Sequence, residues 1–112
     1  MNKKYIIRKN EEIQKIIEHN NRMISKCFVI YYDKNELNHN RYCISVSKKI
    51  GHAVVRNFYK RRIKDILMKN NINNSHDYVI ILRNSILSVK YEFIRDELIE
   101  LLKGVERWKR KS

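Results

Sequence analysis

Residues 45–69 read SVSKKIGHAVVRNFYKRRIKDILMK, and this stretch decides how the rest of the chain is interpreted. Its beginning belongs to the run Arg41–Ser47, in which larger apolar side chains alternate with smaller ones, a pattern that predicts a strand with one buried face. The later part, Ala53–Lys69, has apolar residues at helical spacing. Gly51, one of two glycines in the chain, lies between them, where it allows a close backbone approach or a positive φ.

The predicted helix concentrates the positive charge of the chain. Lys48–Lys69 has a net charge of +7, with Asp65 as its one acidic residue, out of +13 for all 112 residues. At about 100° per residue, one arc of the helix carries the apolar side chains that we expect to face the core, namely Val55, Tyr59, Ile63 and Ile66. The opposite arc holds Asn57, Lys60, Arg61 and Lys64, with Arg56 beside it. Arg61 with Asp65 is the only internal ion pair expected, so this face suits a line of phosphates.

Together with Gly51, two further features favour nucleic-acid binding over a basic helix that is merely solvated. Lys48, Lys49 and His52 extend the positive surface onto the loop before the helix N-terminus, a position suited to anions. The amide of Asn57 lies among the cations and can donate to phosphate or accept from a 2′-hydroxyl. For Lys60 or Lys64 taken alone, a solvated surface would be the better explanation of the charge.

The remaining elements predict an α/β sandwich. Asn10 precedes two glutamates and apolar residues at helical spacing, which predicts an N-capped helix that ends near His19 or Asn20. The apolar runs Cys27–Tyr32 and Tyr78–Arg83 are typical of strands, the second covered on both faces. Ser88 is the predicted cap of a last amphipathic helix. Helices packed on a small sheet are therefore expected.

Length and composition limit the class of protein. We expect one domain over residues 1–112, with a frayed basic tail at about 106–112. No apolar run approaches the ~18 residues of a membrane span, and no secretory segment follows the first residues. Cys27 and Cys43 lie in apolar runs and are predicted to be reduced and buried, as in a cytoplasmic protein.

The residue pattern offers little for independent catalysis. The four histidines have no nucleophile at a paired spacing, and the two cysteines lack the spacing of a zinc site. The carboxylates of the last helix have the spacing of a solvated face; they are Glu92, Asp96, Glu97 and Glu100. We therefore expect no catalytic residue and no bound metal in the protein itself.

The stretch from Ser45 to Asn57, followed by Lys60-Arg61, resembles the signature K-x-G-x-A-V-x-R-N…K-R of the protein subunit of bacterial ribonuclease P. Residues 28–31 resemble the first strand of that family, and residues 77–81 its last. The resemblance implies the order α-β-β-β-α-β-α, a four-stranded sheet and a ribosomal-protein-like fold. It also implies a left-handed β-α-β crossover, against the usual right-handed rule.

The same resemblance implies a function. The family assists a catalytic RNA, with its Mg²⁺, in removing the 5′ leader of precursor tRNA, and one protein monomer binds each RNA. Contacts with the catalytic RNA are implied for Lys48, Lys49, His52, Arg56, Asn57, Lys60, Arg61 and Lys64. The leader is expected in a cleft near Ile13, Ile17 and Tyr31, where the Tyr31 ring can stack on a base.

Several positions depart from the family pattern. Phe58 stands where an arginine is usual, and Arg62 stands where an apolar residue is usual, four residues later, so a cation–π contact between them is expected. Ile13 and Ile17 replace aromatic residues of the cleft, and core packing is an alternative role for them and for Tyr31. The alternatives to this function are a ribosomal or similar structured-RNA protein and a protein-only nuclease.

Overall fold

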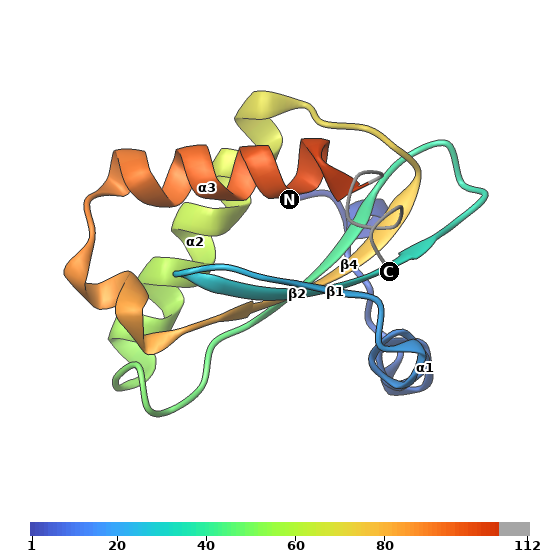
Figure 1. Ribbon diagram of the computed structural model, residues 1–112. Coiled ribbons are helices and arrows are strands. Elements are labelled where there is room, and N and C mark those ends of the chain that lie inside the picture. Colours follow the sequence, from blue (N-terminus) through green and yellow to red (C-terminus); the bar gives the residue numbers. More distant parts are fainter. Residues whose placement is uncertain (106–112) are drawn as a thin grey trace.

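The elements follow the expected order α-β-β-β-α-β-α (Figure 1). A computed structural model describes residues 1–105, so the predicted fraying of the tail falls outside the described residues. The helices are α1 (Asn10–His19), α2 (Ala53–Asn70) and α3 (Tyr91–Lys103), with short 3-10 helices at Lys3–Tyr5 and Asn84–Ser88. The strands are β1 (Arg22–Ile24), β2 (Phe28–Lys34), β3 (Arg41–Ser45) and β4 (His76–Leu82).

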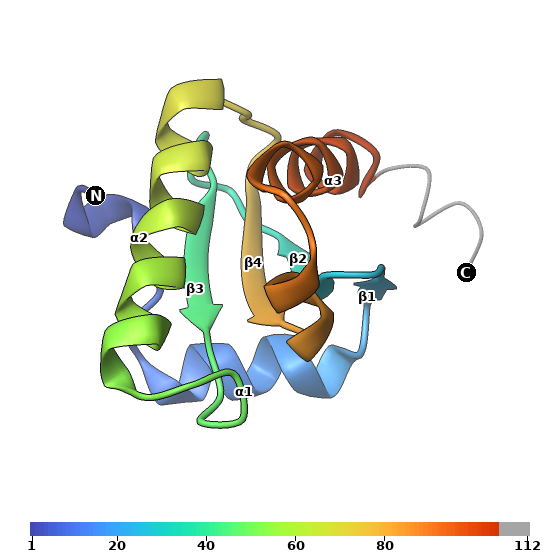
Figure 2. The same ribbon diagram turned by 90° about the vertical axis from the view of Figure 1, so that its left-hand side faces the viewer.

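The four strands form one sheet in the order β1-β2-β4-β3. The pairs β1–β2 and β2–β4 are antiparallel, whereas β3 and β4 are parallel and are joined by the crossover through α2. Helices α2 and α3 cover one face of the sheet, and α1 lies against the other (Figures 1 and 2). The predicted α/β sandwich is confirmed.

Alternation along the strands divides the apolar residues between the two faces. The larger core lies between the sheet and helices α2 and α3, and includes Phe28, Ile30, Tyr78, Ile80, Ile63, Ile66, Leu98 and Leu102. A smaller cluster of Ile7, Ile16 and Val79 lies on the face that α1 covers. Because β4 lies between two neighbours and under helices on both faces, it is almost completely buried, as its continuous apolar run predicted.

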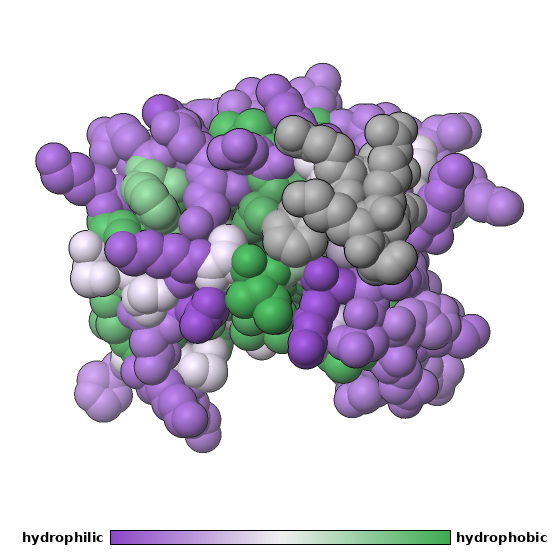
Figure 3. Space-filling model, viewed as in Figure 1, coloured by the Kyte–Doolittle hydropathy of each residue, from purple (hydrophilic) through white to green (hydrophobic). Residues whose placement is uncertain are grey.

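Hydrophilic residues cover most of the surface seen from the side of Figure 1, with hydrophobic residues showing between them in the middle of the view (Figure 3). Cys27 is buried and Cys43 is half-buried, and both thiols are free. Within residues 1–105, no helix has the length and apolarity that crossing a membrane requires.

The structure corrects the position of one strand. Residues 28–31 belong to the second strand of the chain, since β1 precedes them and pairs Met23 with Ile30. The residue pattern gave no sign of β1 because the strand has three residues and its exposed Ile24 is as apolar as the buried Met23, so the alternation of burial does not appear in the residue types.

The predicted caps and strand ends also differ in detail. Asn10 is already the first residue of α1, and Lys9 takes the cap position without a side-chain hydrogen bond. Ser88 does not cap α3; its hydroxyl donates to the Ser85 carbonyl, and Lys90 precedes the helix. β3 ends at Ser45, two residues earlier than the alternation predicted.

Candidate RNA-binding surfaces

The predicted RNA-binding residues lie on α2 and on the loop before it. Lys48, Lys49 and His52 are exposed on that loop, and Asn57 and Arg61 are exposed on the helix; Arg56, Lys60 and Lys64 are half-buried. None of the cations in this set has an ion-pair partner among residues 1–105. Their charge therefore remains available for an external polyanion.

Lys60 and Lys64 turn toward the edge strand β3. Together with Cys43 and Ile6 they line a hollow of about 180 Å³ between α2, β3 and the N-terminal segment. That segment reaches β3 through a bridge between Ile6 and Tyr42, so the edge of the sheet is partly covered there. The basic face of α2 thus has two parts. Asn57 and Arg61 point outward and form the crest of the helix, and Lys60 and Lys64 lie on the side toward β3.

Arg56 occupies a tighter position than its neighbours on α2. Its side chain is half-buried, and its Nε atom is buried without a hydrogen-bond partner among the described residues. A buried N–H group without an acceptor lowers the stability of the folded protein, and a hydrogen bond to an acceptor removes that cost.

Gly51 allows the loop to approach the first turn of α2. A Cβ atom built on Gly51 would lie 2.9 Å from side-chain atoms of Val55, which is closer than real Cβ atoms come. The φ angle of Gly51 is not positive, so a close approach, and not a left-handed turn, explains glycine at this position.

The predicted ion pair between Arg61 and Asp65 is wrong. The Asp65 carboxylate lies 3.1 Å from Nζ of Lys69, one turn later on α2. The i, i+4 spacing is the same in either direction, so the sequence alone could not choose between the two partners. Because Asp65 pairs with Lys69, the positive charge of Arg61 on the outer face has no acidic partner among residues 1–105.

The predicted contact between Phe58 and Arg62 is confirmed. The guanidinium carbon of Arg62 lies 4.7 Å from the centroid of the Phe58 ring and 4.6 Å from that of Tyr91. Tyr91 begins α3, so the arginine links the two helices.

A second surface lies between α1 and the sheet. Ile13 and Ile17 of α1 and Tyr31 of β2 all pack, half-buried, around the cluster of Ile16 and Val79. Tyr31 stands directly opposite Val79 in the register of β2 and β4. The three predicted leader-binding residues are therefore brought together, with part of each side chain open to solvent.

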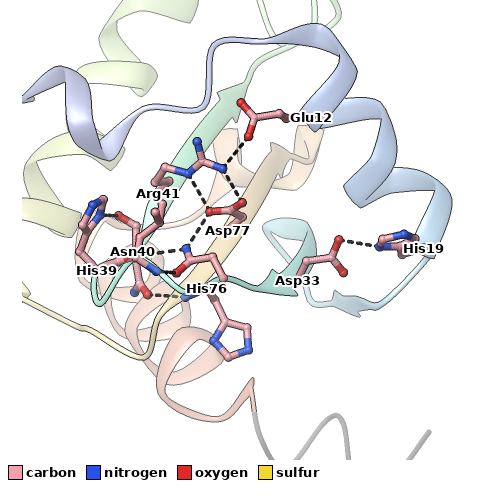
Figure 4. Close-up of polar contacts among 10 residues, drawn as sticks. Glu12, His19, Asp33, His39, Asn40, Arg41, His76 and Asp77 are labelled. Atoms are coloured by element: carbon pink, nitrogen blue, oxygen red, sulfur yellow. Dashed lines mark hydrogen bonds and ion pairs between the residues drawn. The ribbon is translucent and has the colours of Figure 1, made fainter.

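Polar contacts tie α1 to the sheet beside this surface (Figure 4). Nη2 of Arg41 lies 2.9 Å from Oε2 of Glu12 and 2.7 Å from Oδ2 of Asp77. At the other end of α1, Nδ1 of His19 lies 2.7 Å from Oδ2 of Asp33. These contacts hold both ends of the helix against the strands.

Asp77 is the centre of this network. Its carboxylate also accepts a hydrogen bond from Nδ2 of Asn35 at 2.8 Å. Hydrogen bonding to Asp77 and Glu12 raises the pKa of Arg41 above its already high ordinary value, so its charge is permanent. Sequence reasoning missed Glu12, Arg41 and Asp77, although an aspartate at the start of a buried apolar strand was the signal available.

The described residues contain no group of three or more His, Cys, Asp or Glu side chains placed to hold a metal ion. His76 is buried, and its Nδ1 lies 2.7 Å from the Asn74 carbonyl. Burial raises the pKa of both thiols, that of Cys27 to about 12, so neither favours the reactive thiolate at neutral pH.

The protein is an α/β sandwich with two distinct surfaces. One is a row of cations along α2 without acidic partners, and the other is a partly exposed apolar and aromatic surface under α1. These features are typical of a small basic protein that binds a polyanion such as RNA. Comparison with known proteins narrows this class. The family model described as Ribonuclease P matches residues 1–106, and the chain belongs to that family.

The similarity between this chain and its relatives extends over nearly the whole length of both. A ribonuclease P protein component of Mycoplasma mycoides is 44% identical over 110 residues, which cover 95% of this chain and 100% of the relative. One from Geobacillus is 40% identical, covering 98% and 97%. The solved RNase P protein of Staphylococcus aureus superposes with a TM-score of 0.77 at 35% identity, over 88% of this chain and 93% of that one.

Proposed function

We propose that this chain is the protein subunit of a ribonuclease P, and that it assists a catalytic RNA in removing the 5′ leader of precursor tRNA. Membership of the family supports the role, since the relatives are ribonuclease P protein components. The observation that carries the proposed RNA contact is the uncompensated positive face of α2 with the loop before it.

The α2 face is proposed to dock on the catalytic RNA. Arg61 and Asn57 are exposed on its crest, and Lys48, Lys49 and His52 lie on the adjoining loop. The phosphates of a folded RNA can bind such a row of cations while all of its bases remain stacked. Arg56 has no ion-pair partner among residues 1–105, and its half-buried guanidinium would add positive charge to the same face. Lys60 and Lys64 would widen the contact toward β3.

The surface between α1 and the sheet is proposed to hold the leader. A single strand needs flat or apolar side chains for its bases more than it needs charge. Tyr31 offers a half-exposed ring for stacking, and Ile13 and Ile17 form an apolar wall on α1. The ion pair of Arg41 with Glu12 and the hydrogen bond of His19 with Asp33 would keep that wall at a constant distance from the sheet.

The chemistry is proposed to belong to the RNA and its bound Mg²⁺. The protein would supply affinity for the substrate and for the folded RNA, and no cofactor of its own. We further propose a cytoplasmic complex with one protein monomer for each catalytic RNA.

Reconstitution tests the proposal. Purified protein is added to a ribonuclease P catalytic RNA and a precursor tRNA at low Mg²⁺, and 5′ cleavage is followed. Enhanced cleavage at the mature 5′ end supports the proposal. Absence of enhancement, with tight binding to ribosomal or other structured RNA, would favour the alternative of a general RNA-binding module. Cleavage that survives exhaustive removal of RNA would indicate a protein-only nuclease.

A further inference from the structure

The proposed function uses the hollow between α2 and α3 only at Arg61, which lies at its border with the docking face. It measures about 620 Å³ and is lined by Phe58, Arg61, Arg62, Asp65, Lys69 and Tyr91. Asp65 is the one acid of this lining, and it is paired with Lys69. The hollow therefore has a net positive charge together with two aromatic rings.

Arg62 is held in place by those rings. Its guanidinium carbon lies 4.7 Å from the Phe58 centroid and 4.6 Å from the Tyr91 centroid. It donates no hydrogen bond to another residue in the part of the chain that the structure describes. A fixed guanidinium with free N–H groups can donate two parallel hydrogen bonds to a phosphate or to a base edge.

Phe58 supplies an open apolar surface at the same place. Its side chain is 44% exposed, although the ring also makes an edge-to-face contact with Tyr59 at 5.3 Å between centroids. An aromatic face left open beside fixed cations is the arrangement on which an unpaired base stacks while its phosphate is neutralised.

We propose that this hollow binds an unpaired nucleotide of the catalytic RNA, with its base stacked on Phe58 and its phosphate or base edge bound by Arg62 and Arg61. The proposal rests on the docking of α2 described above. Base-paired RNA does not fit, because its bases are stacked on one another and closed to an outside ring. The hollow would therefore add recognition of an unpaired site to the phosphate contacts of the α2 crest.

Phe93 provides a matched control within the same chain. It is also 44% exposed and also has a cation near its ring, Lys26 Nζ at 5.7 Å. It lies two residues after Tyr91 on α3 and does not line the hollow. An effect that follows from losing any exposed phenylalanine will therefore appear when either Phe58 or Phe93 is replaced, whereas loss of a base at the hollow will appear only for Phe58.

The experiment compares Phe58→Leu, Phe58→Trp and Phe93→Leu in the full chain, by binding to the catalytic RNA over a series of salt concentrations. Loss of one stacked base predicts that Phe58→Leu binds about 5- to 140-fold more weakly. The salt dependence should stay unchanged because no charge is removed. Phe58→Trp and Phe93→Leu should bind within about twofold of the unchanged chain, and thermal unfolding checks that all variants are folded.

The outcomes separate this inference from the proposed function. If Arg61→Ala weakens binding but Phe58→Leu does not, docking by α2 stands and the nucleotide site is overturned. If Phe58→Trp is as weak as Phe58→Leu, stacking is overturned as the cause, and a shape-specific protein contact would be favoured instead. If the unchanged chain does not bind the RNA, the proposed function and the nucleotide site are both overturned.

Discussion

Arg41 and Asp77 face each other on the parallel strands β3 and β4 and are joined by two hydrogen bonds, Nε to Oδ1 at 2.9 Å and Nη2 to Oδ2 at 2.7 Å. The same Nη2 also reaches Glu12, so one guanidinium connects two strands to α1. The position of α1 on the sheet therefore depends on an ion pair as well as on apolar packing.

Replacing Asp77 by alanine should lower the free energy of unfolding by about 2–4 kcal/mol, because it leaves a largely buried guanidinium without its main partner. Glu12→Gln is the matched control; the Glu12 side chain is 37% exposed, so its loss should cost less than about 1 kcal/mol. Urea unfolding measures both. If both variants lost only a little free energy of unfolding, and by the same amount, the pairing of Arg41 with Asp77 would not be important for stability.

Arg61→Ala should weaken binding to the catalytic RNA and reduce the slope of log K against log salt by roughly one phosphate contact. Lys103→Ala is the control, since Lys103 is an exposed cation at the end of α3 and is not among the predicted RNA contacts. Arg56→Ala should lower affinity in the same way, but its half-buried position calls for a check of stability. Unchanged affinity across the salt series would contradict the docking role.

Tyr31→Ala should weaken binding of precursor tRNA to the assembled complex by about 1–3 kcal/mol while leaving mature tRNA, which has no leader, little affected. Tyr31→Phe keeps the ring and should retain most of the affinity. Parallel titrations with the two RNAs measure the difference. Equal losses for precursor and mature tRNA would remove Tyr31 from the leader surface.

Stability should fall above pH 9 in a way that depends on Cys27. Burial, with the negative charge of Glu97, raises the pKa of this thiol from 9.0 to about 12. Between these values the unfolded chain loses the proton and the folded chain keeps it. The contribution is therefore complete below pH 9 and declines above it, by at most about 1.4 kcal/mol per pH unit.

Cys27→Ala tests this explanation. Burial also raises the pKa of Tyr42 and Cys43, so the variant should keep some alkaline loss but with a shallower slope. Urea unfolding at several pH values between 7 and 11 gives the comparison. An identical pH dependence in the variant and the unchanged chain would exclude Cys27 as a source.

Local patterns predicted the elements where burial was regular. The alternation of Arg41–Ser47 and the helical spacing of Ala53–Lys69 both gave the right element type, and each missed its end by no more than two residues. The short β1 gave no pattern, because its place in the sheet depends on pairing with β2 and not on its own three residues. The Arg61–Asp65 pair failed because two partners of equal spacing competed for one carboxylate.

The sequence by itself determined the α/β class, the basic face of α2 and membership of a family, because these depend on residue types at short spacings along one chain. The tertiary structure decided which side chains share a surface. It placed Tyr31 beside Ile13 and Ile17, and it brought the ring of Tyr91 to the same guanidinium of Arg62 that contacts Phe58. Such contacts join residues far apart in sequence, and only the packing of helices on both faces of the sheet brings them together.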